Sequence, residues 1–252
     1  MFAPTATFPP RPVLGISVPG WPIIGLFVVA TAGLTAGSLA LLGPWGWIIA
    51  AVCGLLTLWC VWFFRDPARA IPADAGLMVS PADGVVCMIV QAAPSDLDPA
   101  HPPVTRVSVF MNVFNVHVNR APIEGTAESL RYHPGKFFNA SFDKASTDNE
   151  RLAMGIRLRD GRLCVCVQIA GLVARRIVCQ VRTGTALGRG DRYGLIRFGS
   201  RVDVYLPPGF VSAVQVGQRV VAGETIIARD TAAGDAAATG STADDGAARG
   251  TA

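Results

Sequence analysis

The chain is divided by a single uncharged block, Pro22–Phe64, which reads PIIGLFVVATAGLTAGSLALLGPWGWIIAAVCGLLTLWCVWFF. The block contains no Asp, Glu, Lys, Arg or His, and it is about twice as long as the roughly 20 apolar residues that one bilayer-spanning helix needs. The tetrapeptide Gly-Pro-Trp-Gly at 43–46 supplies a turn near its middle. We therefore predict a membrane-spanning helical hairpin over 21–64, preceded by an N-terminal segment over 1–20.

Two other interpretations of the block fit less well. A secretory signal peptide is shorter and follows a cluster of basic residues, which is missing here. A hairpin buried inside a globular domain would need a large apolar surface to cover it, and the rest of the chain offers none of that size. The composition agrees with a membrane segment, because 51% of the 252 residues are hydrophobic and only 16% are charged. Ordinary soluble domains have about 25% charged residues.

Basic residues on both sides of the block predict its orientation. Arg11 precedes it, and Arg65 and Arg69 follow it, so the positive-inside rule places both ends in the cytoplasm. The residues after about 70 are then expected on the cytoplasmic face of the cell (inner) membrane. Reducing conditions there suit the six cysteines, which form no C-x-x-C pair and indicate neither a zinc site nor a disulfide framework.

After the hairpin the pattern is mainly β, and we predict a second domain over 65–230 of the α+β class in which strands dominate. Short runs rich in β-branched residues are bounded by Gly, Pro or Asp. These runs are Gly84–Val90, Arg106–Val113, Leu163–Ile169, Arg176–Val181, Val202–Leu206 and Thr225–Ala228. The alternation over Val216–Thr225 resembles the hairpin of lipoyl/biotinyl-type barrel sandwiches, with Pro81–Gly84 opening a partner half. No lysine follows Lys144, so the carrier function of such barrels is absent.

The C-terminal third is rich in arginine and ends in a polar tail. Residues 231–252 are mostly small, and we predict that they are disordered. Residues 151–201 hold eleven arginines against Asp160 and Asp191. Nucleic acid is disfavoured as their partner, because no series of aromatic residues accompanies them and the chain is tethered to a membrane. An anionic lipid surface is the better partner, and a solvated strand face is the simpler alternative.

Four segments carry the residues that are suited to chemistry. They are Phe64–Pro67 (FRDP), Ser80–Gly84 (SPADG), Asn112–Pro122 (NVFNVHVNRAP) and Arg197–Tyr205 (RFGSRVDVY). Alone, Asp83 is a common turn residue, His117 is a strand histidine and Ser200 is a small residue before a strand. Together they provide a carboxylate, an imidazole and a hydroxyl, which is the set that activates a serine.

In this order the four segments resemble those of phosphatidylserine decarboxylase, in particular its short branch, often called archaeal-type. The resemblance extends from about residue 63 to 228 and includes His133–Ala140 (HPGKFFNA), Asp143–Ser146 (DKAS) and Asn149–Arg151 (NER). The longer branch has Leu-Gly-Ser-Thr at the serine motif and a further histidine at the position of Phe114. This chain has Phe-Gly-Ser-Arg and Phe114, as the short branch does.

The resemblance implies a self-processing catalytic domain with a covalent pyruvoyl group and no metal. Ser200 would attack the Gly199 carbonyl, with His117 as the base and Asp83 orienting the imidazole, and the chain would break between Gly199 and Ser200. Elimination and hydrolysis would turn residue 200 into pyruvoyl, which would form a Schiff base with the amine of phosphatidylserine. Decarboxylation, with His117 as the proton donor, would yield phosphatidylethanolamine.

The partners expected on this basis are a lipid and the chain's own fragments. Fragments 1–199 and 200–252 would stay together as a heterodimer, and a homo-oligomer stays open. One cation and two aromatic rings in the loop Lys136, Phe137, Phe138 and Asn139 suit a lipid headgroup, although a packed surface loop is the alternative. Two other functions stay open: a membrane-anchored serine hydrolase, which would lack the Gly-x-Ser-x-Gly elbow, and a non-enzymatic β-barrel module.

Overall fold

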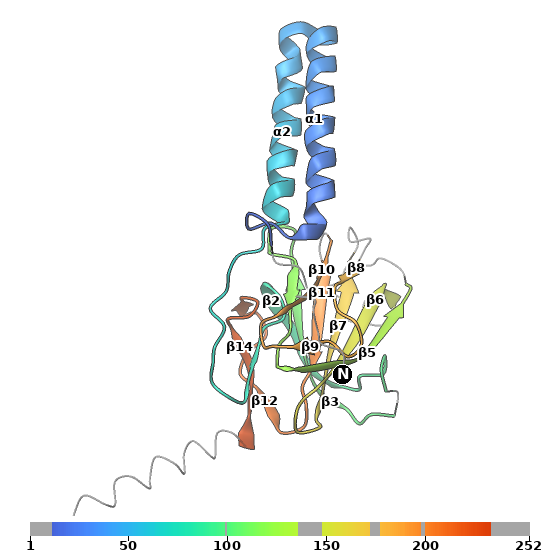
Figure 1. Ribbon diagram of the computed structural model, residues 1–252, viewed down its shortest axis with the longest axis vertical. Coiled ribbons are helices and arrows are strands. Elements are labelled where there is room, and N and C mark those ends of the chain that lie inside the picture. The colour runs from blue at the N-terminus through green and yellow to red at the C-terminus, as the bar shows by residue number, and fades with distance from the viewer. Residues whose placement is uncertain (1–11, 99, 136–147, 172–176, 198–199, 233–252) are drawn as a thin grey trace, which may run out of the picture.

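A computed structural model describes residues 12–98, 100–135, 148–171, 177–197 and 200–232 of the chain. In this part of the chain, two long helices project from one end of a β domain (Figure 1). The fold is mainly β, as the alternating runs predicted. Of the predicted tail, only Thr231 and Ala232 belong to the described residues.

The uncharged block forms the two helices, α1 (Trp21–Leu42) and α2 (Gly46–Phe63). Short 3-10 helices precede α1 (η1, Val18–Gly20) and connect it to α2 (η2, Gly43–Trp45). The two helices lie side by side, with the Thr31 and Thr57 hydroxyl oxygens 2.8 Å apart. Gly46 approaches α1 so closely that a Cβ there would lie 2.6 Å from the Ser38 carbonyl carbon, so only glycine fits.

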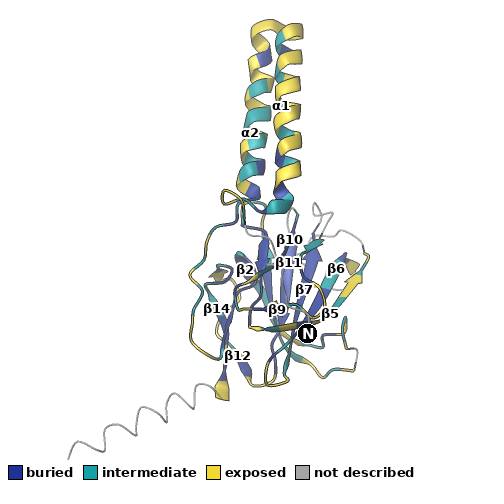
Figure 2. Ribbon diagram, in the orientation of Figure 1, coloured by how far each residue is buried: buried dark blue, intermediate teal, exposed yellow. Residues whose placement is uncertain are grey.

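Most of the helical surface is exposed, whereas the interior of the β domain is buried (Figure 2). The segment Val18–Phe63 is long and apolar enough to cross a membrane, judged by length and composition. The helix ends next to the β domain are the exception to this exposure. There Ile24, Cys60, Phe63 and Phe64 form a buried cluster with Leu195. This cluster joins the base of the helices to the β domain.

The β domain consists of one curled eight-stranded sheet and two three-stranded sheets, with antiparallel pairing throughout the described strands. The large sheet has the order β13 (Arg219–Val220), β2 (Gly84–Ala92), β3 (Val104–Met111), β11 (Ser200–Tyr205), β7 (Leu163–Ala170), β6 (Arg151–Arg157), β5 (Gly125–His133) and β9 (Ala186–Leu187). One small sheet has the order β1 (Leu77–Val79), β14 (Ile226–Asp230) and β12 (Phe210–Ser212), and the other has the order β4 (Val118–Arg120), β10 (Arg192–Ile196) and β8 (Ile177–Cys179). Each of the six predicted runs overlaps one of these strands.

Strand β11 lies near the middle of the large sheet and is buried along its whole length. Its side chains alternate between two faces. Val202 and Val204 belong to the main apolar core on one face. On the other face the Arg201 guanidinium donates to the Asp203 carboxylate at 3.0 Å, and both residues are buried.

Many of the described arginines in the arginine-rich stretch are engaged in ion pairs. Five of its arginines pair with acidic side chains of the same chain: Arg151 with Asp96, Arg157 with Glu128, Arg162 with Asp160 and Asp230, Arg192 with Asp66, and Arg201 with Asp203. Arg201 is fully buried. These five arginines are paired within the chain, and the contact of the stretch with an anionic lipid surface stays a prediction.

Candidate active site

Ser200 is the first residue of β11 and is fully buried. It pairs with Met111, the last residue of β3, and with Ala170, the last residue of β7. Three strand ends therefore meet at Ser200. The Ser200 hydroxyl lies 3.9 Å from the Met111 sulfur, which is a weak acceptor. The hydroxyl is thus shielded from solvent, and among the described residues its partner is this weak acceptor.

His117 lies directly before β4 and is buried. Its main-chain carbonyl accepts a hydrogen bond from the Ile196 amide at 3.3 Å, so His117 is tied to the segment that leads into Ser200. Its Nδ1 lies 3.0 Å from the Asn115 main-chain carbonyl oxygen. Because a carbonyl only accepts, Nδ1 must carry the hydrogen, and Nε2 then holds the lone pair that a general base needs.

The surroundings of His117 keep its imidazole neutral. Burial lowers the pKa of His117 to about 4, the hydrogen bond to the Asn115 carbonyl opposes this shift, and the positive charge of Arg65 adds to it. The Phe63 ring, at the end of α2, covers the imidazole with ring centroids 4.4 Å apart. A neutral imidazole at physiological pH can accept a proton.

Asp83 lies in the turn before β2, and its described partners differ from the expected one. Both carboxylate oxygens accept hydrogen bonds from the Arg69 guanidinium, at 2.8 and 2.9 Å. The Ala222 amide also donates to Asp83 at 2.8 Å. Among the described residues, Asp83 therefore binds Arg69 and the 221–225 turn. The hydrogen bond to His117 Nδ1 that was expected from Asp83 is made by the Asn115 carbonyl.

Asp83 nevertheless lies in the same electrostatic neighbourhood as His117. Burial lowers the pKa of Arg65, and the negative charge of Asp83 opposes that shift. Arg65 in turn acts on His117. The next residue, Gly84, brings the turn against β3, because a Cβ at this position would lie 2.1 Å from the Phe110 carbonyl oxygen. Asp83 and Ser200 thus stand at the same end of the sheet, on β2 and β11, the two neighbours of β3.

The motif at 64–67 also holds this end of the domain together. The buried Asp66 carboxylate accepts from Arg120 at 3.0 Å and from Arg192 at 2.5 Å. Arg120 further donates to the carbonyls of Pro67 and Gly190. These contacts tie the segment that follows α2 to β4 and β10, the strands next to His117.

A buried polar group beside Ser200 was not anticipated from the sequence. The Gln168 side chain donates to Asn119 Oδ1 at 2.8 Å, and Asn119 Nδ2 lies 3.7 Å from the Met111 sulfur. Asn149 donates to the Ala170 carbonyl at 2.7 Å. Met111 and Ala170 are the two strand partners of Ser200, so these amides support its position. Asn119 belongs to the quoted motif at 112–122 and Asn149 to the quoted motif at 149–151, and these two motifs were the signals for the group.

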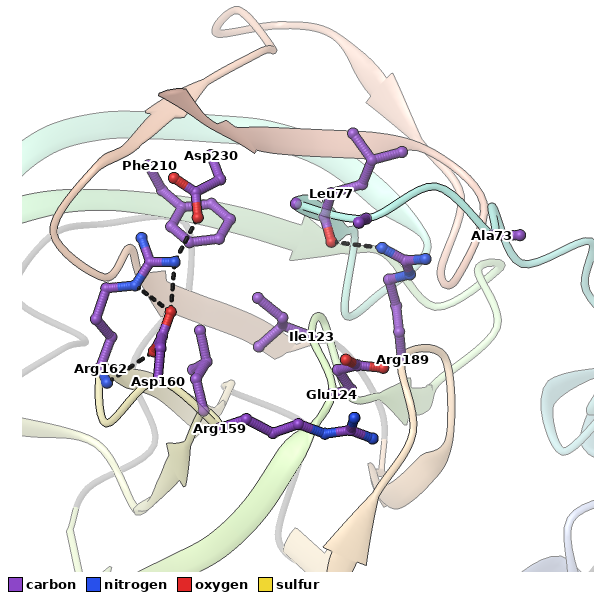
Figure 3. A pocket seen from close by; sticks show the side chains of 13 residues that line it. Ala73, Leu77, Ile123, Glu124, Arg159, Asp160, Arg162, Arg189, Phe210 and Asp230 are labelled. Carbon is purple, nitrogen blue, oxygen red and sulfur yellow. Dashed lines mark hydrogen bonds and ion pairs between the residues drawn. The ribbon is translucent and has the colours of Figure 1, made fainter. Parts of the chain in front are cut away.

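Two of the predicted site segments cannot be placed. Gly199 and the loop Lys136, Phe137, Phe138 and Asn139 lie outside the described residues. A hollow of about 290 Å³ is visible elsewhere, lined among others by Glu124, Arg159, Arg162 and Arg189 (Figure 3). It lies beyond the end of β6 and beside β14, at the opposite end of β7 from Ser200, and it shares no residue with the predicted site.

Comparisons with known proteins agree on one family. A model of the family described as phosphatidylserine decarboxylase matches residues 56–228. A phosphatidylserine decarboxylase proenzyme of Cereibacter sphaeroides is 57% identical over 203 residues, which cover 80% of this chain and 86% of that protein. The proenzyme of the same name from Paramagnetospirillum magneticum is 53% identical over 210 residues, covering 83% and 84%. That from Nitratidesulfovibrio vulgaris is 51% identical over 224 residues, covering 87% and 96%.

Proposed function

The chain belongs to the phosphatidylserine decarboxylase family, and on that premise we propose that Ser200 is the residue that becomes its pyruvoyl group. The enzyme decarboxylates phosphatidylserine to phosphatidylethanolamine with a pyruvoyl group formed by self-cleavage. The break lies between Gly199 and Ser200. The observation that carries this assignment is the place of Ser200: a buried serine after a glycine, at the first position of a central strand. It follows Ile196, whose amide binds the carbonyl of the neutral His117, by four residues.

The self-cleavage follows from groups of the chain itself. His117 Nε2 accepts the proton of the Ser200 hydroxyl, whose oxygen attacks the Gly199 carbonyl carbon, and the peptide nitrogen leaves as an amine. This replaces the peptide bond by an ester. Loss of the residue 200 α-proton then breaks the bond between Cβ and the ester oxygen, and releases the 1–199 carboxylate. Water replaces the nitrogen of the resulting dehydroalanine, and ammonia leaves.

The residues around position 200 fit the group that results. After cleavage, residue 200 becomes the start of a chain, and strand pairing with Met111 and Ala170 still holds it on both sides. The pyruvoyl group supplies a ketone that binds an amine and accepts the electrons released as carbon dioxide leaves. In this proposal, His117 returns a proton to the substrate α-carbon.

Asp83 is assigned a positioning role. Its bonds to Arg69 and to the Ala222 amide hold three segments together: the one that follows α2, the turn before β2 and the 221–225 turn. The Asn115 carbonyl, rather than Asp83, selects the imidazole tautomer. Asp83 thus supports the end of the sheet at which Ser200 lies, and its negative charge opposes the positive charge of Arg65, which acts on His117.

The setting of the enzyme completes the proposal. The helices α1 and α2 span the cell (inner) membrane as a hairpin, and the catalytic domain over 65–230 lies on the cytoplasmic face, supported by the arginines that flank the hairpin. The loop 136–139 binds the headgroup. Backbone hydrogen bonds between residues 217–225 and 80–86 support the likeness to a barrel sandwich. The motif Phe-Gly-Ser-Arg supports membership of the short branch.

Intact mass spectrometry of the purified full chain tests the serine assignment. The expected products are 1–199 and 200–252, the shorter being about one fifth of the 26.4 kDa chain and blocked to Edman degradation because its first residue lacks an amine. Ser200→Ala should remain one inactive chain, because alanine has no attacking oxygen. Ser108→Ala is the matched control, since Ser108 is another fully buried serine, in the neighbouring strand β3, and this variant should still cleave.

The same measurement separates the other two functions. A serine hydrolase that used Ser200 for acyl transfer would be active as an uncut chain, and a non-enzymatic module would be uncut and inactive. Recovery of either from the unmodified sequence would reject the assignment of Ser200.

A further inference from the structure

We propose that the β domain itself inserts side chains into the bilayer surface, through a collar of Val13, Leu14, Trp62 and Phe114 around the base of the helices. This inference rests on the proposed membrane hairpin and adds a second contact with lipid. All four residues are exposed although they are apolar or aromatic. They come from three separate segments that meet where the helices join the β domain.

Leu14 is the strongest sign that the collar has a function. It has a positive φ of 53°, the only such value outside glycine among the described residues, and 87% of its surface is exposed. It lies at the tip of a tight turn closed by the Val13 and Ile16 main chains, and the next residue, Gly15, also has a positive φ. Turns of this kind favour Asn-Gly. The backbone strain of a leucine in such a turn has a cost in free energy, and exposure of its side chain to water does not offset that cost. An apolar contact outside the chain would offset it.

The turn is attached firmly to the helix base. The Asp66 amide donates to the Gly15 carbonyl at 2.7 Å, and the Ser17 amide donates to the Phe64 carbonyl at 2.9 Å. Leu14 is therefore held at a set depth relative to the end of α2.

Phe114 is held in a similar way on the loop before His117, and 64% of its surface is exposed. Its amide donates to the Asn112 side chain at 2.9 Å, and its carbonyl accepts from Arg65 at 2.8 Å. The Arg65 guanidinium also stacks on the exposed Trp62 ring, 4.3 Å from its centroid. A tryptophan beside a long cationic side chain is typical of the zone between lipid tails and water.

A lipid surface fits the collar better than a protein partner. The collar continues the exposed apolar surface of α1 and α2, and Arg65, which contacts Trp62 and Phe114, adds a cation that suits a lipid phosphate. It also has a direct use, because the loop that carries Phe114 carries the Asn115 carbonyl that holds His117. When the collar is inserted into the bilayer surface, the layer of lipid headgroups lies close to His117 and Ser200. The lipid substrate can then react without leaving the membrane.

Depth-dependent fluorescence quenching tests this with the full chain. A fluorescent amino acid is introduced by codon suppression at position 14, 114 or, as a control, 211. Val211 is a 54% exposed apolar residue on β12, far from the helices (Figure 1). The proteins are reconstituted in vesicles of phosphatidylcholine and phosphatidylglycerol that contain spin-labelled lipid. Strong quenching at 14 and 114, and little at 211, is expected.

Flotation of the same vesicles separates this inference from the proposed hairpin. Protein that floats with the vesicles but is quenched equally weakly at 14, 114 and 211 would overturn the collar and leave the hairpin standing. Protein that does not float would overturn both. Weak quenching together with a cross-linked dimer through position 14 would assign the surface to a second copy of the chain, and it would also overturn the lipid contact.

A substitution at Leu14 gives an independent test, because strain and lipid contact predict opposite effects. Asparagine tolerates the positive φ, so Leu14→Asn should keep or raise the melting temperature in detergent. It should nevertheless lower turnover of phosphatidylserine in vesicles by roughly tenfold, with turnover in detergent micelles unchanged. Val211→Asn is the matched control, and its ratio of vesicle to detergent activity should equal that of the unmodified protein. An unchanged ratio in Leu14→Asn would overturn the collar.

Discussion

At the scale of single residues, the main finding concerns the surroundings of His117, the proposed base. A main-chain carbonyl, from Asn115, selects its tautomer, and the Phe63 ring keeps it dry. The side-chain pattern of aspartate, histidine and serine predicted a carboxylate in the first of these roles. Every residue has a main-chain carbonyl, so residue types do not indicate which carbonyl will contact a histidine. For that reason the sequence pattern indicated the side chain of Asp83 instead.

The stability of the uncut chain should depend on pH through His117. Its pKa is about 4 in the folded chain and about 6.5 when unfolded, so between these values only the unfolded chain binds the proton. The free energy of unfolding should therefore rise from pH 4 to pH 6.5, by roughly 3 kcal/mol at most. His117→Gln should flatten this rise. Urea unfolding in detergent, in the Ser200→Ala background where one chain unfolds, provides the measurement, and an equal slope with and without His117 would contradict it.

Asp83 and Arg69 should act as one unit. Asp83→Asn and Arg69→Gln each break the same ion pair, so each should slow self-cleavage, and the double variant should be little slower than the worse single variant. The rate of appearance of the 200–252 fragment on a gel measures this. Arg69→Lys keeps the charge but not the paired hydrogen bonds, and it should fall in between. If Asp83 acted on His117 directly, Arg69→Gln would cleave at the normal rate.

At the scale of elements, the end of α2 belongs to the proposed active site as well as to the proposed membrane hairpin. Phe63 packs on His117 and joins the buried cluster of Ile24, Cys60, Phe64 and Leu195. The sequence predicted the length of this helix from the uncharged block, and the structure has it within one residue of the expected end. The contact of the Phe63 ring with the His117 imidazole depends on the packing of segments about fifty residues apart in the sequence. Hydrophobic periodicity reflects only local structure and does not predict such a contact.

Phe63→Ala should move the pH dependence of self-cleavage. With the native ring in place, the rate should be constant down to about pH 5 and fall below it as His117 takes up a proton. Removing the ring admits water, so the pKa of His117 should rise towards 6.5 and the fall should begin at higher pH. Phe63→Leu keeps most of the apolar cover and serves as the control. Rate profiles from pH 4 to pH 8 that coincide for the two variants would show that the ring does not keep His117 dry.

At the scale of the whole molecule, the sequence predicted which segments are strands better than how they associate. The alternation of Val202 and Val204 predicted β11, but not that β3 and β7 flank it or that the partners of Ser200 are Met111 and Ala170. The arginine-rich stretch shows the same limit. Counted along the chain it indicated one basic surface, whereas the folded chain distributes five of these charges over separate internal ion pairs, because acidic partners such as Asp66 and Asp96 come from distant segments.

Because β11 lies in the middle of the large sheet, a mature enzyme that has unfolded should not refold readily. Before the cut, β11 enters the sheet as part of one chain, and folding is unimolecular. With the cut at the proposed position before Ser200, the strands β11, β12, β13 and β14 then belong to a separate, shorter polypeptide, and β11 lies between two strands of the longer one. A denatured mature enzyme would have to recapture this strand in a bimolecular step, while the bare edges of β3 and β7 invite aggregation. The working lifetime of the enzyme is therefore set by how slowly it unfolds, and its precursor acts as the only template from which the fold is made.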